Sequence, residues 1–99
     1  MVRHQAHLIL GRAALRAGNV TVASQELLAA GNVGGGGTLS SFGPNMTLAK
    51  ELLERGIRDV VIQYLEECRR FWKRGGSLDS WIATIRNGRI PEFGPNLIY

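Results

Sequence analysis

The fold is decided by two stretches of the chain, residues 10–30 (LGRAALRAGNVTVASQELLAA) and residues 48–68 (LAKELLERGIRDVVIQYLEEC). At an offset of 38 residues they share six of 21 positions: Leu10/Leu48, Leu15/Leu53, Gly18/Gly56, Val22/Val60, Gln25/Gln63 and Leu27/Leu65. On both sides of the shared glycine, apolar residues recur at the spacing of one helix face. Glycine readily takes the left-handed conformation that ends a helix. Each copy therefore predicts two short helices joined by a turn, at Gly18 and at Gly56.

Residues 1–99 are predicted to form one all-α domain, since no run of the sequence demands a strand. Repeat 1 (4–30) contains helices at 4–17 and about 20–30, with Asn19 or Thr21 capping the second. Residues 31–45 contain six glycines and no charge, which predicts a flexible linker. Repeat 2 (46–73) contains a helix that ends at about residue 55, with Asn45 or Thr47 as its cap. After Gly56, a second helix runs from about residue 58 to residue 73. A capping helix follows at 77–88, capped by Ser77, and two prolines predict an extended tail over 89–99.

The hydrophobic core is expected where the apolar faces of these helices meet, because repeats of this length must stack to bury them. Burial is predicted for Leu10, Ala14, Ala23, Leu27, Leu48, Leu52, Val61, Leu65, Trp72, Trp81 and Ile85.

A finer pattern runs through both copies. The first copy has Leu10-Gly11, Ala14, Gly18, Ala23, Leu27 and Ala30, and the second has Leu48-Ala49, Leu52, Gly56, Val61, Leu65 and Cys68. This pattern resembles the tetratricopeptide repeat (TPR), although that family has tryptophan at His7, proline at Gly35, glycine at Ala49 and alanine at Val61 and Cys68. Phe42-Gly-Pro-Asn, Ala49-Lys-Glu-Leu-Leu and Arg70-Phe-Trp-Lys are similar to stretches of bacterial TPR-like proteins of unassigned role. The resemblance implies a cytoplasmic array of two helix pairs plus a C-terminal capping helix that acts as a protein–protein interaction scaffold.

Bases recur at one position of the two copies, Arg12 and Lys50. In TPR proteins this position faces an inner groove, so the resemblance implies that both bases face a groove, with Arg16 one turn later. It also implies an apolar floor of Leu8, Leu15, Met46 and Leu53. Such a groove suits an acidic peptide or a C-terminal carboxylate. TPR proteins that clamp carboxylates also use asparagine, and none is expected in this groove. The alternative is that these bases form an ordinary solvated helix face.

The net charge of +4 is concentrated near the end of the sequence, where residues 68–99 carry six bases against two acids. Arg69, Arg70, Lys73 and Arg74 fall in the predicted last turn of a helix, where cations oppose the helix dipole. The alternative function is an RNA- or DNA-binding adaptor that uses this cluster together with Phe71 and Trp72. Nucleic acid is the less favoured partner, because the two aromatic residues continue the apolar stripe.

No pattern for catalysis, metal binding or a cofactor is found in the sequence. Gly34–Gly37 lack the lysine of a phosphate-binding loop. His4 and His7 are too few for a metal site, and His7 is expected to pack. Cys68 lies on an apolar helix face, where a buried thiol is inert. The apolar runs are too short to span a membrane. We therefore expect neither an enzyme nor a cofactor-dependent protein.

The tail contains a second copy of a short motif, because Phe42-Gly-Pro-Asn45 recurs as Phe93-Gly-Pro-Asn96. Either the same turn is used twice, or Asn96 begins another helix. Two repeats are few for a stable array, so either the tail folds back across the helices or a second chain supplies the missing layer. A homodimer, or a fragment of a longer array, is predicted, with Leu8 and Ile9 as the uncovered surface.

Overall fold

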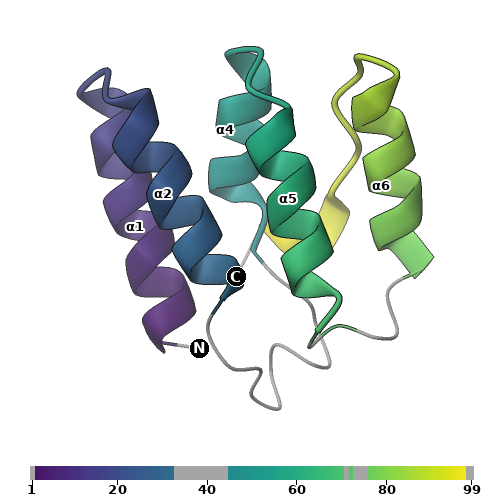
Figure 1. Ribbon diagram of the computed structural model, residues 1–99, viewed down its shortest axis with the longest axis horizontal. Helices are drawn as coiled ribbons and strands as arrows, with labels where there is room; N and C mark the ends of the chain where they lie inside the picture. The colour runs from purple at the N-terminus through teal and green to yellow at the C-terminus, as the bar shows by residue number, and fades with distance from the viewer. Residues whose placement is uncertain (1, 33–44, 71, 73–75, 98–99) are drawn as a thin grey trace.

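The structure is a computed structural model that describes residues 2–32, 45–70, 72 and 76–97. Its elements are the α-helices α1 (Val2–Arg16), α2 (Val20–Gly31), α4 (Thr47–Glu54), α5 (Asp59–Cys68) and α6 (Gly76–Arg86), and the 3-10 helix η1 (Gly94–Leu97). The described residues thus contain five α-helices and no strand, which confirms the predicted all-α class. Figure 1 shows α1/α2 and α4/α5 as two neighbouring antiparallel hairpins, with α6 next to α5.

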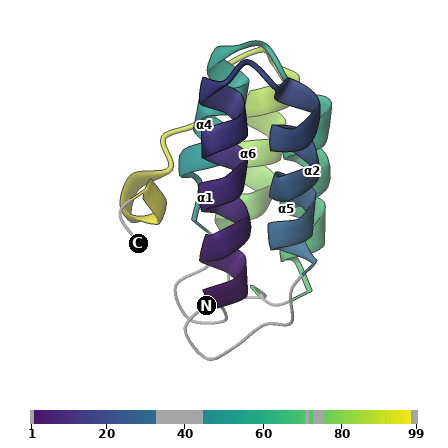
Figure 2. The same cartoon turned by 90° about the vertical axis from the view of Figure 1, so that its left-hand side faces the viewer.

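The two hairpins form two layers. Figure 2 shows α1 and α4 in one layer and α2 and α5 in the other. The short helix η1 lies outside the layer of α1 and α4, so the end of the described chain returns to the side on which both hairpins begin.

Both hairpins turn at the predicted glycine. Gly18 and Gly56 have φ angles of 83° and 81°, a left-handed conformation that costs little only for glycine. After each glycine the chain hydrogen-bonds back to the ending helix, from Asn19 N to Ala14 O (2.8 Å) and from Ile57 N to Leu52 O (3.0 Å). These are Schellman motifs, and they satisfy carbonyl groups that would otherwise lack partners.

The helix bounds differ from the prediction mainly in repeat 2. Asn19 caps α2 as predicted, since its Oδ1 accepts a hydrogen bond from Val22 N (3.1 Å). However, α5 ends at Cys68 instead of residue 73, and α6 begins at Gly76, so Ser77 lies inside the helix and not at its cap. Most of the predicted linker, 33–44, lies outside the described residues.

The predicted core is confirmed at most positions. Eight of the expected residues are buried: Ala23, Leu27, Leu48, Leu52, Val61, Leu65, Trp81 and Ile85. Ala14 and Trp72 are half-buried and pack against this core.

The prediction for Leu10 is wrong, because its side chain is 56% exposed. Leu8 is buried instead, with an exposed fraction of 4%. The helical spacing identifies apolar stripes but not which of them faces the core, and Leu8 and Leu10 lie on nearly opposite sides of the helix. Gly11 makes that choice, because it faces α4 and α2 at close range and thereby directs Leu8 and Leu15 inward.

The tail folds back on the helices and is not simply extended. Phe93 is buried with its ring 5.0 Å from that of Trp81, at an interplanar angle of 78°. Met46 N donates to Asn96 O (2.8 Å), and Thr47 Oγ1 donates to Leu97 O (3.2 Å). The second Phe-Gly-Pro-Asn motif and Leu97 therefore contact Met46 and Thr47, which directly follow the first motif. Of the first motif itself, the structure describes only Asn45.

Candidate functional site

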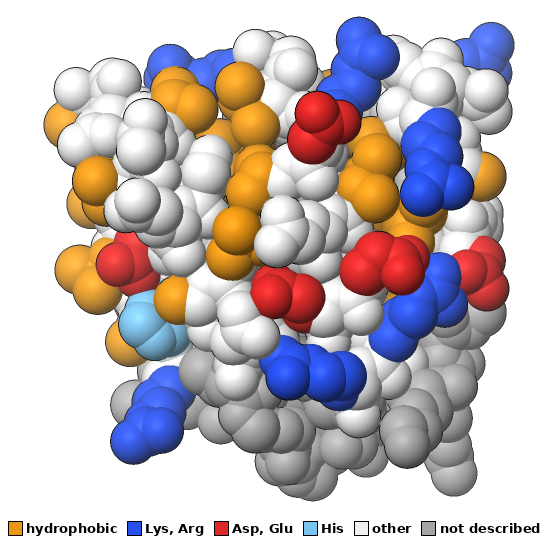
Figure 3. Space-filling view, in the orientation of Figure 1, with side chains coloured by type: hydrophobic (Ala, Val, Ile, Leu, Met, Phe, Trp, Pro, Cys, Tyr) orange, Lys and Arg blue, Asp and Glu red, His pale blue; other side chains and the backbone are white. Residues whose placement is uncertain are grey.

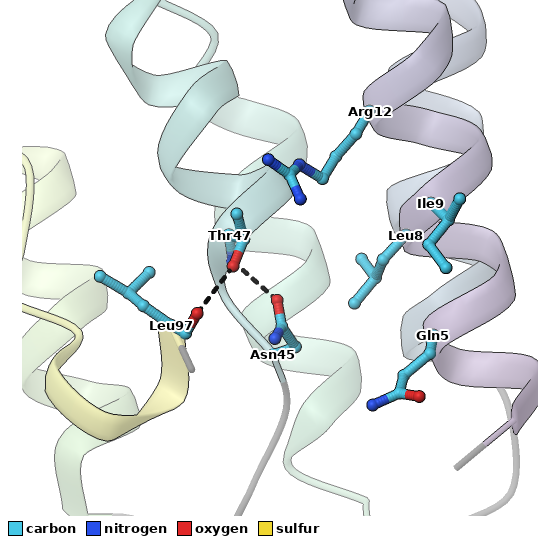
Figure 4. A pocket seen from close by; sticks show the side chains of 7 residues that line it. All are labelled: Gln5, Leu8, Ile9, Arg12, Asn45, Thr47 and Leu97. Carbon is cyan, nitrogen blue, oxygen red and sulfur yellow. Dashed lines mark hydrogen bonds between the residues drawn. The ribbon is translucent and has the colours of Figure 1, made fainter. Parts of the chain in front are cut away.

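A pocket of about 240 Å³ opens between α1, the start of α4 and η1. It is lined by Gln5, Leu8, Ile9, Arg12, Asn45, Thr47 and Leu97 (Figure 4). We call it the α1/α4 pocket. Its three contributing segments are far apart in sequence, and they meet because the tail hydrogen-bonds to the first residues of α4.

Asn45 is held firmly on one wall of the α1/α4 pocket. Its N–H donates to His4 Nε2 (3.1 Å), and its carbonyl accepts from the hydroxyl of Tyr64 (2.9 Å). Its Oδ1 accepts from Thr47 N (2.9 Å), which satisfies a free donor in the first turn of α4. With these groups fixed, the side-chain NH2 of Asn45 makes no hydrogen bond with the described residues and is left as a donor beside the pocket.

His4 anchors this wall from inside the core. It is fully buried, its Nδ1 lies 3.0 Å from Ala30 O, and its Nε2 accepts the N–H of Asn45. The first contact needs a proton on Nδ1 and the second a lone pair on Nε2, so the ring fits as the neutral tautomer. Burial lowers the pKa of His4, which also favours this neutral form.

Arg12 supplies the charge at the mouth of the α1/α4 pocket. Its Nε donates to Glu51 Oε1 of α4 (2.8 Å), and both side chains are about one-third exposed (37% and 31%). The terminal amino groups of Arg12 make no hydrogen bond with the described residues. Figure 4 shows the guanidinium extending across the opening toward Thr47. Glu51 thus holds the guanidinium of Arg12 in place through Nε, while the terminal amino groups of Arg12 remain available to donate hydrogen bonds.

The residues of the predicted groove do not all line this pocket. Leu8 and Arg12 do, whereas Arg16 is exposed one turn beyond and Lys50 is half-buried on α4. The other predicted floor residues are in the core, with exposed fractions of 4% for Leu15, 0% for Met46 and 6% for Leu53. Met46 also joins the tail to α4, because its backbone N–H donates to Asn96 O (2.8 Å).

Five pocket residues were not among the predicted site residues: Gln5, Ile9, Asn45, Thr47 and Leu97. Gln5 and Ile9 precede Arg12 at helical spacing, so a search along that stripe of the helix would find them. The sequence predicts Asn45 only as a helix cap, whereas the structure also places it in the lining of the pocket. For Leu97, the single sequence signal is the repeated Phe-Gly-Pro-Asn motif that precedes it.

The two described residues of the predicted nucleic-acid cluster, Arg69 and Arg70, are engaged within the fold. Arg69 pairs with Asp79 and with Glu66 (3.2 Å), and these two carboxylates raise the pKa of Arg69. The guanidinium of Arg69 in turn lowers the pKa of Asp79. Arg70 Nη2 donates to Asn32 Oδ1 (2.6 Å) at the end of α2. Figure 3 shows acidic and basic side chains lying next to one another across this face. Lys73 and Arg74 lie outside the described residues.

The thiol of Cys68 and the imidazole of His7 are also held within the helix packing. Cys68 is buried, and burial raises the pKa of its thiol. His7 Nδ1 lies 2.7 Å from Glu26 Oε2, so it bonds across the α1/α2 hairpin in addition to packing. The described residues contain no group of three or more His, Cys, Asp or Glu that could hold a metal ion. In the same residues, no helix has the length and apolar character needed to cross a membrane.

Compared with known proteins, the chain matches no protein-family model, no curated protein and no solved structure.

Proposed function

We propose that the chain is a TPR-like protein-binding module, without catalytic activity, that holds an acidic or C-terminal peptide segment in the α1/α4 pocket. One observation carries the proposal: Arg12 is fixed through its Nε by Glu51, while its terminal amino groups face the opening of a partly apolar pocket. The TPR-like arrangement is supported by the 38-residue offset of the two hairpins and by the glycine turn shared between them.

The chemistry of the wall favours a carboxylate as the recognised group. The two terminal amino groups of Arg12 match the two oxygens of a carboxylate, and charge-assisted bonds of this kind are strong. Asn45 and Gln5 add amide donors nearby, and no acidic residue lines the pocket. Leu8, Ile9 and Leu97 provide the apolar surface for one side chain of the peptide. A peptide that ends in an apolar residue supplies both the carboxylate and the apolar side chain.

Fluorescence anisotropy tests the proposal directly. The probe is a labelled acidic peptide that ends in leucine with a free carboxylate, and its amidated form is the reference. The double variant Arg12→Gln/Glu51→Gln removes the guanidinium without leaving Glu51 unpaired. We expect it to bind the free-carboxylate peptide about 10-fold or more weakly, since a hydrogen bond to a charged group is worth about 1.5–3 kcal/mol.

Arg3→Gln is the matched control, because it removes the same charge from the same helix at an exposed position that does not line the pocket. The Arg12–Glu51 pair is partly exposed, so its removal should change the free energy of unfolding by about 1 kcal/mol or less. Equal binding of the free and amidated peptides, or full binding by the double variant, would show that the pocket is not a carboxylate site.

A further inference from the structure

A second surface of α1 is apolar and uncovered. The helix buries His4, Leu8, Gly11 and Leu15 toward the core, and its opposite side is exposed. That side, which we call the outer stripe, consists of Ala6, Ile9, Leu10 and Ala13 of α1, together with Ala17, which directly follows the helix. Ile9 and Leu10 are 67% and 56% exposed, more than any other large apolar side chain described. Single exposed apolar residues are ordinary, but a continuous row along one side of α1 and the residue that follows it indicates a contact surface.

The charged residues that α1 itself places beside the outer stripe are all basic, and the nearest acidic side chain of α2, Glu26, is already paired with His7 (2.7 Å). The helix α1 contains Arg3, Arg12 and Arg16 and no acidic residue. Arg12 is paired with Glu51, whereas Arg3 and Arg16 are exposed and form no ion pair with the described residues. At about 100° per residue, Arg3 falls on one edge of the stripe and Arg16 on the other, roughly 20 Å apart along the axis. A second α1 packed on this one would bring more arginine and no carboxylate.

We propose that the outer stripe docks a helix of another protein, apolar on one face and acidic on both edges of that face. Ile9 and Leu10 would insert between its apolar side chains, and the alanines would allow a close approach of the two helix axes. Its edge carboxylates would meet Arg3 and Arg16. This surface is distinct from the α1/α4 pocket, although Ile9 borders both.

Two synthetic helical peptides test the proposal by fluorescence anisotropy. They share a leucine and alanine face, and one has glutamate at both edges where the other has lysine. We expect the glutamate peptide to bind about five-fold or more tightly than the lysine peptide at low salt. The difference should shrink as salt is added, because exposed charges are screened. The variant Arg3→Glu/Arg16→Glu should reverse the preference.

Further variants separate this surface from the pocket. Leu10→Gln should weaken binding of the glutamate peptide without lowering the melting temperature, because Leu10 is largely exposed. Arg12→Gln/Glu51→Gln should leave that binding unchanged while it weakens the carboxylate peptide, so failure of one site is distinguishable from failure of the other. Equal binding of both helical peptides, or a preference that survives charge reversal, overturns the proposal. So does a light-scattering mass of twice 10.8 kDa that Leu10→Gln restores to 10.8 kDa, because a second copy would then cover the stripe.

Discussion

Leu48 of α4 packs against Gly11 of α1 so closely that a Cβ on residue 11 would overlap the Leu48 Cδ2 atom. The same Cβ would lie 3.1 Å from Glu26 Cβ and 3.3 Å from Ala23 O, both on α2. Gly11 is therefore the point at which α1 meets two other helices. The absence of a side chain at this position sets how closely the two hairpins pack.

The variant Gly11→Ala should lower the free energy of unfolding by about 1–3 kcal/mol, the usual cost of an overpacked core. Alanine is the better helix former by about 1 kcal/mol, so any destabilisation must come from packing. Urea denaturation measures the change. In a Leu48→Ala background the destabilisation by Gly11→Ala should be smaller, because the overlapping Leu48 Cδ2 atom is gone while the contacts with Glu26 and Ala23 remain. A variant as stable as the wild type would contradict the close contact.

The orientation of α1 is tested by a matched pair of substitutions, Leu8→Ala and Leu10→Ala. Both remove the same atoms from the same helix. The first should lower the free energy of unfolding by about 2–5 kcal/mol because Leu8 is buried, and the second by about 0.5 kcal/mol or less because Leu10 is exposed. Thermal melts followed by circular dichroism distinguish the two. Equal losses would mean that the helix does not have this orientation.

The buried His4 should make stability depend on pH. Burial lowers its pKa in the folded protein below the ordinary value of 6.5, so as pH falls the unfolded chain takes up the proton first. Neutral His4 therefore contributes fully to the free energy of unfolding above pH 6.5. This contribution is lost as the pH falls below 6.5, by up to about 1.4 kcal/mol per pH unit. Urea denaturation between pH 7.5 and 5 measures this slope.

The control for this measurement is the slope in two variants. His4→Gln should reduce the pH dependence, because glutamine does not titrate, whereas His7→Gln should retain the part due to His4. An unchanged slope in His4→Gln would show that protonation of this ring is not coupled to unfolding.

Phe93→Ala should release the tail from α6. Phe93 is 2% exposed and contacts Trp81, so the loss is expected to be about 3–5 kcal/mol. Tryptophan emission should move to longer wavelength as Trp81 becomes hydrated. Ile90→Ala, at a 43% exposed position of the same segment, serves as the control and should change neither property. An emission maximum that stays in place would argue against the tail contact.

The sequence by itself determined the two helical hairpins and the glycine turns that join their helices. Gly18 and Gly56 end helices because a left-handed backbone is cheap for glycine, and Asn19 caps α2 because its side chain reaches an amide three residues on. Such signals act within one turn of the chain, so they can be read without knowledge of the fold. The all-α class and most of the core follow from them.

Only the tertiary structure decided which side of α1 is buried and which residues form a site. Helical spacing is satisfied by the stripe of Leu10 as well as by that of Leu8, and the choice depends on the contact of Gly11 with Leu48, 37 positions away. The partners of His4 are Ala30 and Asn45, 26 and 41 residues along the chain. The α1/α4 pocket likewise joins α1 to Asn45 and Leu97. These contacts depend on how the hairpins stack and where the tail returns, which no local periodicity encodes.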